Sequence, residues 1–313
     1  MKLIQRLNDL PDAVRGGAVS IGNFDGVHRG HAQLIRRLVE RAGELGAPSV
    51  VFTFEPHPIT ILRPEQSPPP LTTVARKAQL LGALGVDYVL AYPTDPEFLT
   101  LTAEAYFERI VRQLLDARVL VEGPNFYFGQ QRQGTILVLS KLCQAVGMDL
   151  EVVDPVRQGE HYISSTRVRR TLLDGEVELA ATMLTEPYQI AGRVVHGAER
   201  GRTIGFPTAN LAEVRTLVPA EGVYAGAVPM GGEQHPAAIH IGPNPTYGEA
   251  ARKIEVHLLD WQGDLYDLPL AVDFWQRIRD IRRFASPDEL VAQLHQDVAA
   301  VRDVCGRWEH HPR

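Results

Sequence analysis

The 313-residue sequence contains little cysteine, no long apolar run and no strongly basic segment. Its two cysteines, Cys143 and Cys305, are far apart and lack framework spacing, which argues against a disulfide scaffold and suits a reducing cytoplasm. Residues 1–6 lack the apolar core of a signal peptide, and no run is long enough to span a bilayer. A formal net charge of −6, without basic residues interleaved with aromatics, argues against nucleic acid as a partner.

The most informative stretch is residues 20–31, where glycines fill a turn between an apolar run and a helical pattern. The apolar run 18–21 predicts a strand, and the helix is expected to begin near Gly30. His28 and His31, three apart, would share one face of the first helical turn, beside backbone N–H groups that have no partner within the helix. Such a helix start favours anion binding. A plain turn and a zinc pair are the alternatives, but no neighbouring residue offers zinc-ligand spacing. We therefore expect a phosphate site formed by five further turn residues, Gly22, Asn23, Phe24, Asp25 and Gly26, and the two histidines.

The first half of the chain alternates strands and helices. Strands are expected at 18–21, 49–54, 87–92, 118–121 and 150–153, with helices at about 30–45, 72–84, 102–115 and 135–146. This pattern predicts a parallel sheet covered on both faces, with ligands beyond the carboxyl ends of the strands.

Unusual residues follow the predicted strand ends. Pro56, His57 and Pro58 form a stiff corner after the second strand, and Asn125 and Phe126 lie in an aromatic, glycine-bounded loop after the fourth. These rings suit either the core or a planar ligand. Further on, Ser164, Ser165 or Thr166 is expected to cap a helix ending at Leu173, and Arg169 lies one turn inside it. Hydroxyls, free N–H groups and a guanidinium together predict a phosphate clamp.

The second half has short apolar runs separated by glycine and proline, at 189–195, 222–228, 237–241, 253–258 and 268–274. They predict a small antiparallel barrel, followed by a helix at 286–301. We place the domain boundary near Glu186, which gives domains of residues 1–186 and 187–313.

One barrel stretch, residues 197–210, has a composition that suits phosphate binding. Its spaced glycines, together with two arginines, could wrap phosphates through backbone N–H groups, although a glycine-rich hairpin is the plainer interpretation. The residues expected to bind are Gly197, Gly201, Arg202 and Gly205. Thr208 and Asn210 are two apart, so in a strand they would face one side and offer hard oxygen ligands to Mg²⁺. Glu255, on the run 253–258, is either an outward surface residue or a base.

Together the two halves resemble one family, the bacterial bifunctional riboflavin kinase/FMN adenylyltransferases, also called FAD synthetases. The resemblance covers nearly the whole chain. It depends on residues 22–31, 54–58, 125–129 and 163–169 in the first half, and on 205–210, 222–225, 244–247 and 255–257 in the second. The HRGH element at 28–31 occurs in other nucleotidyltransferases, but its combination with GFPTAN at 205–210 is highly specific.

The resemblance implies a Rossmann-like nucleotidyltransferase domain and a barrel that phosphorylates riboflavin. In the barrel, Glu255 would take the proton of the riboflavin hydroxyl, while Thr208 and Asn210 would hold Mg²⁺ on the ATP phosphates, giving FMN. In the N-terminal domain, FMN would attack a second ATP to give FAD, with His28 and His31 stabilising phosphate charge and Arg169, Ser165 and Thr166 assisting. The implied ligands are riboflavin, FMN, FAD, ATP and Mg²⁺, in a cytoplasmic enzyme that needs neither membrane nor nucleic acid. A homo-oligomer is compatible with this reading.

Three positions depart from the commoner family pattern. Asn125 replaces a frequent Asp, the linker LTEPY at 184–188 replaces Leu-Gly-Arg-Pro-Tyr, and His240 stands where a smaller polar residue is usual. Two other functions stay open: a cytidylyltransferase or pantetheine-phosphate adenylyltransferase with an unrelated barrel, and a flavin or nucleotide sensor without turnover. The GFPTAN loop argues against the first, and the retained His28, His31 and Glu255 argue against the second.

Overall fold

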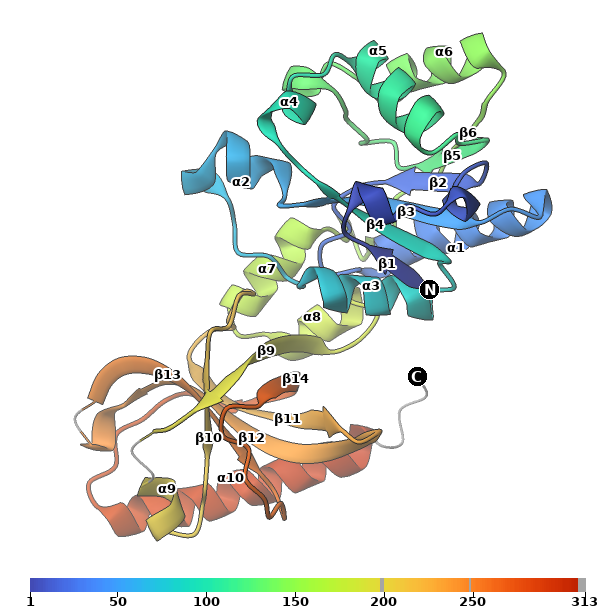
Figure 1. Ribbon diagram of the computed structural model, residues 1–313. Helices are drawn as coiled ribbons and strands as arrows, with labels where there is room; N and C mark the ends of the chain where they lie inside the picture. Colours follow the sequence, from blue (N-terminus) through green and yellow to red (C-terminus); the bar gives the residue numbers. More distant parts are fainter. Residues whose placement is uncertain (198–199, 248, 309–313) are drawn as a thin grey trace. The chain divides into compact units, whose positions relative to one another are not determined.

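The computed structural model describes residues 1–197, 200–247 and 249–308. These residues form two compact units (Figure 1). The first comprises Met1–Pro68 and Thr72–Ser165, and the second comprises Pro69–Leu71 and the chain from Thr166 on.

The first unit is an α/β layer structure built on a parallel sheet. Its described strands are β1 (Lys2–Ile4), β2 (Ala18–Ile21), β3 (Ser49–Glu55), β4 (Tyr88–Pro93), β5 (Val119–Glu122) and β6 (Asp149–Val152), in the spatial order β1-β4-β3-β2-β5-β6. Its helices are α1 (Arg29–Leu45), α2 (Pro58–Leu62), α3 (Val74–Ala83), α4 (Pro96–Leu99), α5 (Ala103–Tyr106), a π-helical continuation (Phe107–Leu114) and α6 (Ile136–Val146). A hairpin, β7 (Arg157–Gln158) and β8 (His161–Tyr162), follows.

Alternate residues of the central strands pack on opposite faces of this sheet. Val19 and Ile21 belong to one core cluster, which includes residues of the α5 region and α6. Ala18 and Val51 belong to the other cluster, which includes residues of α1 and α3. Because helices cover both faces, the central strands β2 and β5 are buried along their whole length. The predicted parallel sheet with helices on both faces is confirmed.

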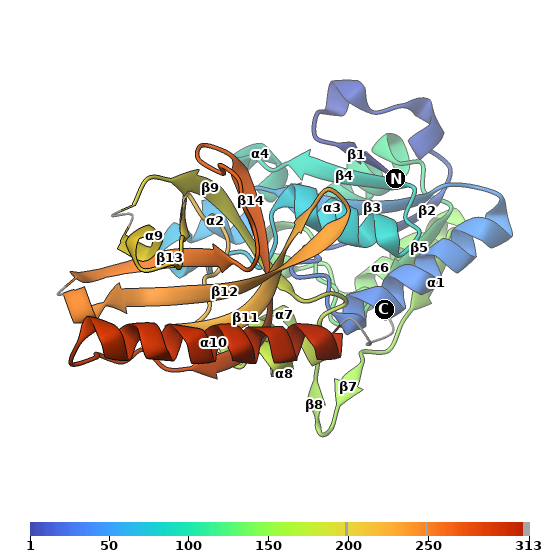
Figure 2. The ribbon, with the colours of Figure 1, turned by 90° about the horizontal axis from the view of Figure 1, so that it is seen from below.

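The second unit contains an antiparallel barrel. In the described chain its strands are β9 (Tyr188–Val195), β10 (Ala209–Ala212), β11 (Gly222–Met230), β12 (Glu233–Asn244), β13 (Glu249–Leu258) and β14 (Pro269–Arg279), closed in the order β10-β13-β12-β11-β14-β9. Three helices, α7 (Ser165–Leu173), α8 (Val177–Met183) and the short α9 (Arg200–Thr203), come before β10. The terminal helix α10 (Pro287–Trp308) lies along the barrel, where it packs against β11, β12 and β14 (Figure 2). The predicted barrel and terminal helix are confirmed.

The sequence prediction missed four short strands of the described chain, namely β7 and β8 of the two-residue hairpin, β1 and β10. β1 is three residues long and pairs only with β4, at the edge of the sheet. β10 is four residues long and directly follows the glycine-rich loop for which phosphate binding is predicted. None of the four is long enough to show a clear hydrophobic period.

Two further observations concern the whole described chain. No helix in it combines the length and apolar character that a bilayer crossing requires. The predicted boundary near Glu186 falls between α8 and β9, inside the second unit, and remains a prediction.

Candidate active sites

The N-terminal site is built on the turn between β2 and α1, whose backbone is strained. Phe24 has a φ of +46° and Val27 a φ of +39°, and both side chains are buried. Left-handed backbone is costly for a β-branched residue, so the surrounding contacts must hold the turn. Asp25 Oδ1 accepts hydrogen bonds from the Thr72 N–H and hydroxyl at 3.1 and 3.2 Å, and the Gly26 N–H donates to Thr72 Oγ1 at 3.2 Å. The turn is therefore preorganised by groups outside it.

His28 and His31 lie together at the start of α1, as predicted. His28 is the N-cap residue: its Nδ1 accepts the His31 N–H at 3.2 Å, and the two rings stack with centroids 3.6 Å apart. Because Nδ1 accepts, the proton of the neutral His28 ring is assigned to Nε2. Burial lowers the pKa of His28 to about 4, although a backbone hydrogen bond and Asp25 oppose the shift. His28 is therefore an uncharged donor at neutral pH.

His31 has the same character. Burial lowers its pKa well below the ordinary value, and His28 and Lys77 add to the shift. Its Nδ1 is buried and has no hydrogen-bond partner in the described part of the chain. The two histidines thus offer neutral imidazole groups at a helix N-terminus, where an anion is favoured.

Lys77 is a functional candidate that the sequence interpretation missed. Its side chain is 6% exposed, and its Nζ donates to Thr53 Oγ1 at 3.1 Å. Burial lowers its pKa, whereas Asp25 and Glu55 raise it. Helical spacing could have revealed it, because Lys77 lies in phase with the buried Leu80 and Leu81 of α3.

Glu122, at the end of β5, is also new. It is 2% exposed, and its Oε1 accepts the N–H of Ile21 at 2.7 Å. In the register of β2 and β5, Ala18 pairs with Val119 and Val19 pairs with Leu120. The Glu122 side chain therefore adds a contact between the two strands at Ile21, the last residue of β2. Burial raises the pKa of Glu122 well above the ordinary value, and the Ile21 hydrogen bond only partly opposes this.

The remaining predicted residues of the first unit lie at the same sheet edge or against the turn. β3 and β5 flank β2, so the segments that follow them are neighbours of the turn. His57 follows β3 and caps α2, its Nδ1 accepting the Ile59 N–H at 3.0 Å. Asn125 follows β5 and is exposed. Ser165 donates its hydroxyl hydrogen to the Asp25 carbonyl at 2.8 Å.

The aromatic rings of the loop after β5 were predicted to belong either to the core or to a site for a planar ligand. Phe128 is buried in the core, and Phe126 stacks on it with centroids 5.4 Å apart. Tyr127 is exposed, with the Arg132 guanidinium 4.3 Å above its ring. The core interpretation therefore holds for Phe128.

Thr166 and Arg169 belong to the second unit, where Arg169 Nε donates to the Pro69 carbonyl at 3.0 Å. Helix α7 begins at Ser165, close to the predicted cap. The phosphate clamp formed with Ser165 remains a prediction.

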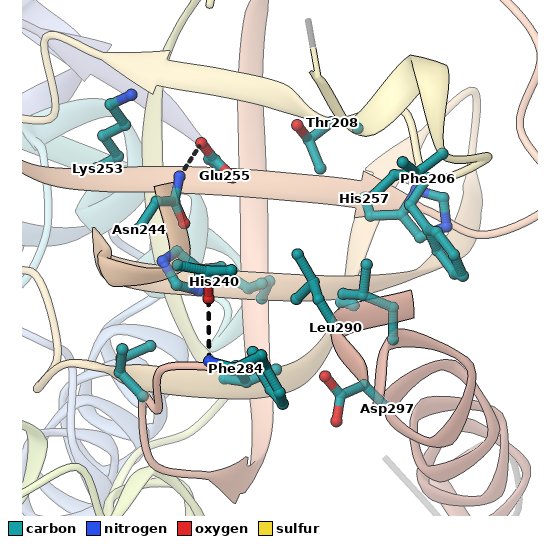
Figure 3. A pocket seen from close by; sticks show the side chains of 18 of the residues that line it. Phe206, Thr208, His240, Asn244, Lys253, Glu255, His257, Phe284, Leu290 and Asp297 are labelled. Atoms are coloured by element: carbon teal, nitrogen blue, oxygen red, sulfur yellow. Dashed lines mark hydrogen bonds between the residues drawn. The ribbon is translucent and has the colours of Figure 1, made fainter. Parts of the chain in front are cut away.

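The second site is a cavity of about 150 Å³ in the barrel unit (Figure 3). Thr208, Asn210 and Glu255 all line it, although they come from different strands or loops. Glu255 is therefore not an outward surface residue. Its Oε1 accepts a hydrogen bond from Asn244 Nδ2 at 3.0 Å.

A transverse row of side chains crosses this cavity. Asn210 on β10 lies opposite Glu255 on β13, which lies opposite His240 on β12. His240 in turn faces Val223 on β11, and Val223 faces Arg279 on β14. All five line the cavity. Neighbouring strands thus place in one row residues that are up to 69 positions apart, from 210 to 279.

The far wall of the cavity is held by a buried ion pair. Arg279 Nη2 lies 2.7 Å from Asp297 Oδ2, and Asp297 is 2% exposed. The Gln293 amide also donates to Asp297, at 2.7 Å. The pair joins β14 to α10 and keeps the guanidinium beside the cavity.

The residues of the glycine-rich loop differ in how they relate to the cavity. Gly201 lines the cavity, and a side chain there would collide with the Phe206 carbonyl. A Cβ at Gly197 would lie 2.2 Å from Asn210 Nδ2, so the absence of a side chain leaves room for this amide. Arg202 is exposed, Gly205 has a φ of +88°, and Ala198 and Glu199 lie outside the described residues.

Two family models match the chain, FAD synthetase over residues 10–167 and Riboflavin kinase over residues 184–305. A bifunctional riboflavin kinase/FMN adenylyltransferase of Escherichia coli K12 is 41% identical over 308 residues, which cover 98% of both chains. The chain belongs to the bifunctional riboflavin kinase/FMN adenylyltransferase family.

Other relatives also match over nearly the whole chain. The family member of Pseudomonas fluorescens is 40% identical over 99% of this chain and 100% of its own. A crystal structure titled as a macrolide-efflux protein from Streptococcus pneumoniae matches with a TM-score of 0.85 and 33% identity, over 96% of this chain and 98% of the other. The FAD synthetase model matches the part of the chain that contains the β2–α1 turn, and the Riboflavin kinase model matches the part that contains the barrel cavity.

Proposed function

We propose that this chain makes both flavin cofactors: it phosphorylates riboflavin to FMN at the barrel cavity and adenylylates FMN to FAD at the β2–α1 turn. Each model names one of these activities. The observation that carries the proposal is the cavity row, where Asn210 and Glu255 lie opposite each other on neighbouring strands. This arrangement places an amide oxygen that can bind Mg²⁺ next to a carboxylate that can act as a base.

In the kinase step, the riboflavin hydroxyl oxygen forms a bond to the γ-phosphorus of ATP. The bond from that phosphorus to the β,γ-bridging oxygen breaks, so that ADP leaves, and the hydroxyl proton goes to the Glu255 carboxylate. Asn244 holds that carboxylate by its 3.0 Å hydrogen bond. No covalent enzyme intermediate is needed, so positioning and charge stabilisation supply the catalysis.

Magnesium fits the kinase cavity as an ion held mainly by nucleotide phosphates. Thr208 and Asn210 offer a hydroxyl and an amide oxygen there, and the missing side chain of Gly197 leaves room for the Asn210 amide. When bound, the ion neutralises charge on the phosphates during transfer.

In the adenylyl step, a phosphate oxygen of FMN forms a bond to the α-phosphorus of ATP. The bond from that phosphorus to the α,β-bridging oxygen breaks, and pyrophosphate leaves. The Nε2–H of His28 donates to phosphate oxygens, and His31 lies beside it in the stack. Lys77 supplies a buried positive charge close to His31. Neutral donors set in a fixed turn stabilise the developing charge without reorganising.

Product chromatography tests the proposal. The purified chain is incubated with riboflavin, ATP and Mg²⁺, and we expect FMN to form first and FAD to follow. A sample with FMN in place of riboflavin should give FAD directly. Absence of both products from riboflavin, with ATP intact, would refute the proposal. A reducing cytoplasm is the proposed location, in keeping with the burial of both cysteine side chains, Cys143 and Cys305.

A further inference from the structure

His257 lines the barrel cavity, and the kinase step above gives it no part. It lies on β13 two residues after Glu255, so the two side chains project to the same side of the strand. Figure 3 shows the His257 ring beside Phe206, with Glu255 further along the same strand. The cavity therefore has a hydrogen-bonding ring one strand repeat away from the proposed base.

The His257 ring contacts the two residues that come immediately before Thr208. Its Nδ1 lies 2.7 Å from the carbonyl oxygen of Pro207, and the ring meets the Phe206 ring edge-on, with centroids 5.6 Å apart. A carbonyl oxygen can only accept, so we assign a hydrogen to Nδ1, which donates it. A side chain of β13 thus holds the segment that leads into the proposed metal-binding residues.

The paired part of β10 and β13 ends before this segment. The pairing starts at Ala209, opposite Val256. Pro207 lies two residues earlier and has no N–H with which to join the ladder, so only its carbonyl can bond across. The His257 hydrogen bond therefore extends the contact between the two strands beyond their first backbone pair.

Other contacts fasten the segment to different elements. The Phe206 N–H donates to the Gly201 carbonyl at 2.8 Å, which closes the loop on itself. The buried Phe206 ring also meets the ring of His295, on α10, edge-on with centroids 5.0 Å apart. These two contacts hold the loop to itself and to the terminal helix, whereas His257 holds it to the strand that carries Glu255.

We propose that His257 is a positioning residue for riboflavin phosphorylation. Its hydrogen bond to the loop fixes the segment 208–210, which is proposed to hold Mg²⁺, relative to the proposed base Glu255. The phosphates would lie at the first of these places and the reacting hydroxyl at the second, so their separation decides whether the transfer is in line. A displacement of about 1 Å can cost on the order of a hundredfold in rate. This inference rests on the proposed kinase function of the cavity.

Two substitutions separate the hydrogen bond from the ring contact. His257→Phe keeps an aromatic ring against Phe206 but cannot donate. His257→Asn loses the ring but has a donor in Nδ2, which is bonded to Cγ as Nδ1 is in histidine. The matched control is His295→Phe, at an exposed position of α10, which keeps an aromatic edge against Phe206 and leaves the Pro207 bond in place.

The first measurement is steady-state FMN formation by the full chain from riboflavin and ATP with excess Mg²⁺. We expect the kcat of His257→Phe to fall roughly tenfold to hundredfold, with the KM for riboflavin much less affected. His257→Asn should recover most of this loss, and His295→Phe should match the natural chain. FAD formation from FMN, measured on the same samples, should be equal in all four proteins, since that reaction belongs to the other site.

The second measurement does not depend on turnover. All three tryptophans of the chain, Trp261, Trp275 and Trp308, belong to the second unit, so their fluorescence reports the unfolding of the barrel. ADP with Mg²⁺ should raise the unfolding temperature of the natural chain more than ADP alone, because a bound ligand stabilises the folded state. This Mg²⁺-dependent rise should be smaller in His257→Phe and restored in His257→Asn.

Three results would overturn the inference. In one, His257→Phe phosphorylates riboflavin at the natural rate. In another, the two His257 variants are impaired equally, so that the ring contact alone matters. In the third, the ligand-free barrel of His257→Phe is unfolded at the assay temperature, which would make the bond a requirement for folding. Failure of the natural chain itself to form FMN would instead refute the proposed kinase function.

Discussion

At the scale of single residues, the imidazole groups of His28 and His31 act as neutral donors, because burial lowers both pKa values. We expect His31→Ala to reduce FAD formation from FMN about a hundredfold, the loss of roughly 3 kcal/mol that follows removal of one preorganised donor. FMN formation from riboflavin should be unchanged. His161→Ala, at an exposed histidine of β8, is the control. Unchanged FAD synthesis in His31→Ala would remove this residue from the mechanism.

His28 needs a different substitution, because its Nδ1 also caps α1. His28→Ala removes the cap as well as the donor, whereas Asn is itself a good cap. His28→Asn should therefore keep the helix start and still lose about a hundredfold in FAD formation from FMN. The rate of pyrophosphate release checks this. If His28→Asn is fully active while His28→Ala is not, the role of His28 is capping alone.

Glu255 is the residue on which the kinase chemistry depends. Glu255→Gln keeps an oxygen that can accept the Asn244 hydrogen bond but removes the base, so FMN formation from riboflavin should fall by about 10² to 10⁴. Added FMN should still become FAD. Glu233→Gln, at an exposed position on β12, serves as the control. A normal rate in the Glu255 variant would mean that another group takes the proton.

At the scale of elements, the junction of β2 and β5 holds the phosphate turn through the buried carboxyl of Glu122. Its pKa is raised above the ordinary value, so the folded state binds this proton more tightly than the unfolded state. The unfolding free energy of the natural chain should therefore fall as pH rises from the ordinary carboxyl pKa to the raised one.

Glu122→Gln does not titrate and can still accept the Ile21 N–H. Relative to the natural chain, the variant should gain stability between pH 5 and pH 8, by at most about 1.4 kcal/mol per pH unit. Urea unfolding followed by far-ultraviolet circular dichroism at the two pH values measures this. Glu160→Gln, at an exposed residue, should show no such gain. A constant difference between Glu122→Gln and the natural chain at both pH values would contradict the account.

Periodicity is what made the long elements predictable. The apolar run 18–21 coincides with β2, which is buried throughout because helices cover both faces of the sheet, and the predicted helix ending at Leu45 coincides with α1. The cavity row could not be predicted, since the register between strands depends on turn geometry and on bulges that leave no local signal. Glu255 was chosen by family resemblance, and His240 was noticed only as a departure.

At the scale of the whole molecule, we propose that the chain can be divided near Glu186. The lining residues of the kinase cavity fall between Gly201 and Val298, so residues 187–313 contain them all. Helix α8 packs against β9 and β14, and the Ala220 N–H donates to the Leu172 carbonyl, so a fragment that starts at residue 166 keeps further contacts.

We expect both fragments to form FMN from riboflavin and ATP, and the longer one to melt at the higher temperature. Thermal unfolding followed by tryptophan fluorescence suits the comparison, because Trp261, Trp275 and Trp308 all lie in these fragments. A folded fragment of residues 187–313 without kinase activity would mean that preceding residues contribute to the site. The proposed boundary would then move toward residue 166.

The central claim is that one chain carries two independent active sites, and mixing two variants tests it most directly. Glu255→Gln and His31→Ala are each incubated with riboflavin, ATP and Mg²⁺, alone and together, and FAD is measured by chromatography. Alone, Glu255→Gln should yield little FMN, and His31→Ala should accumulate FMN with little FAD. Together they should form FAD, because FMN released by one variant is adenylylated by the other. A mixture that yields no more FAD than the two variants separately, while each retains its own partial reaction, would contradict two sites linked by free FMN.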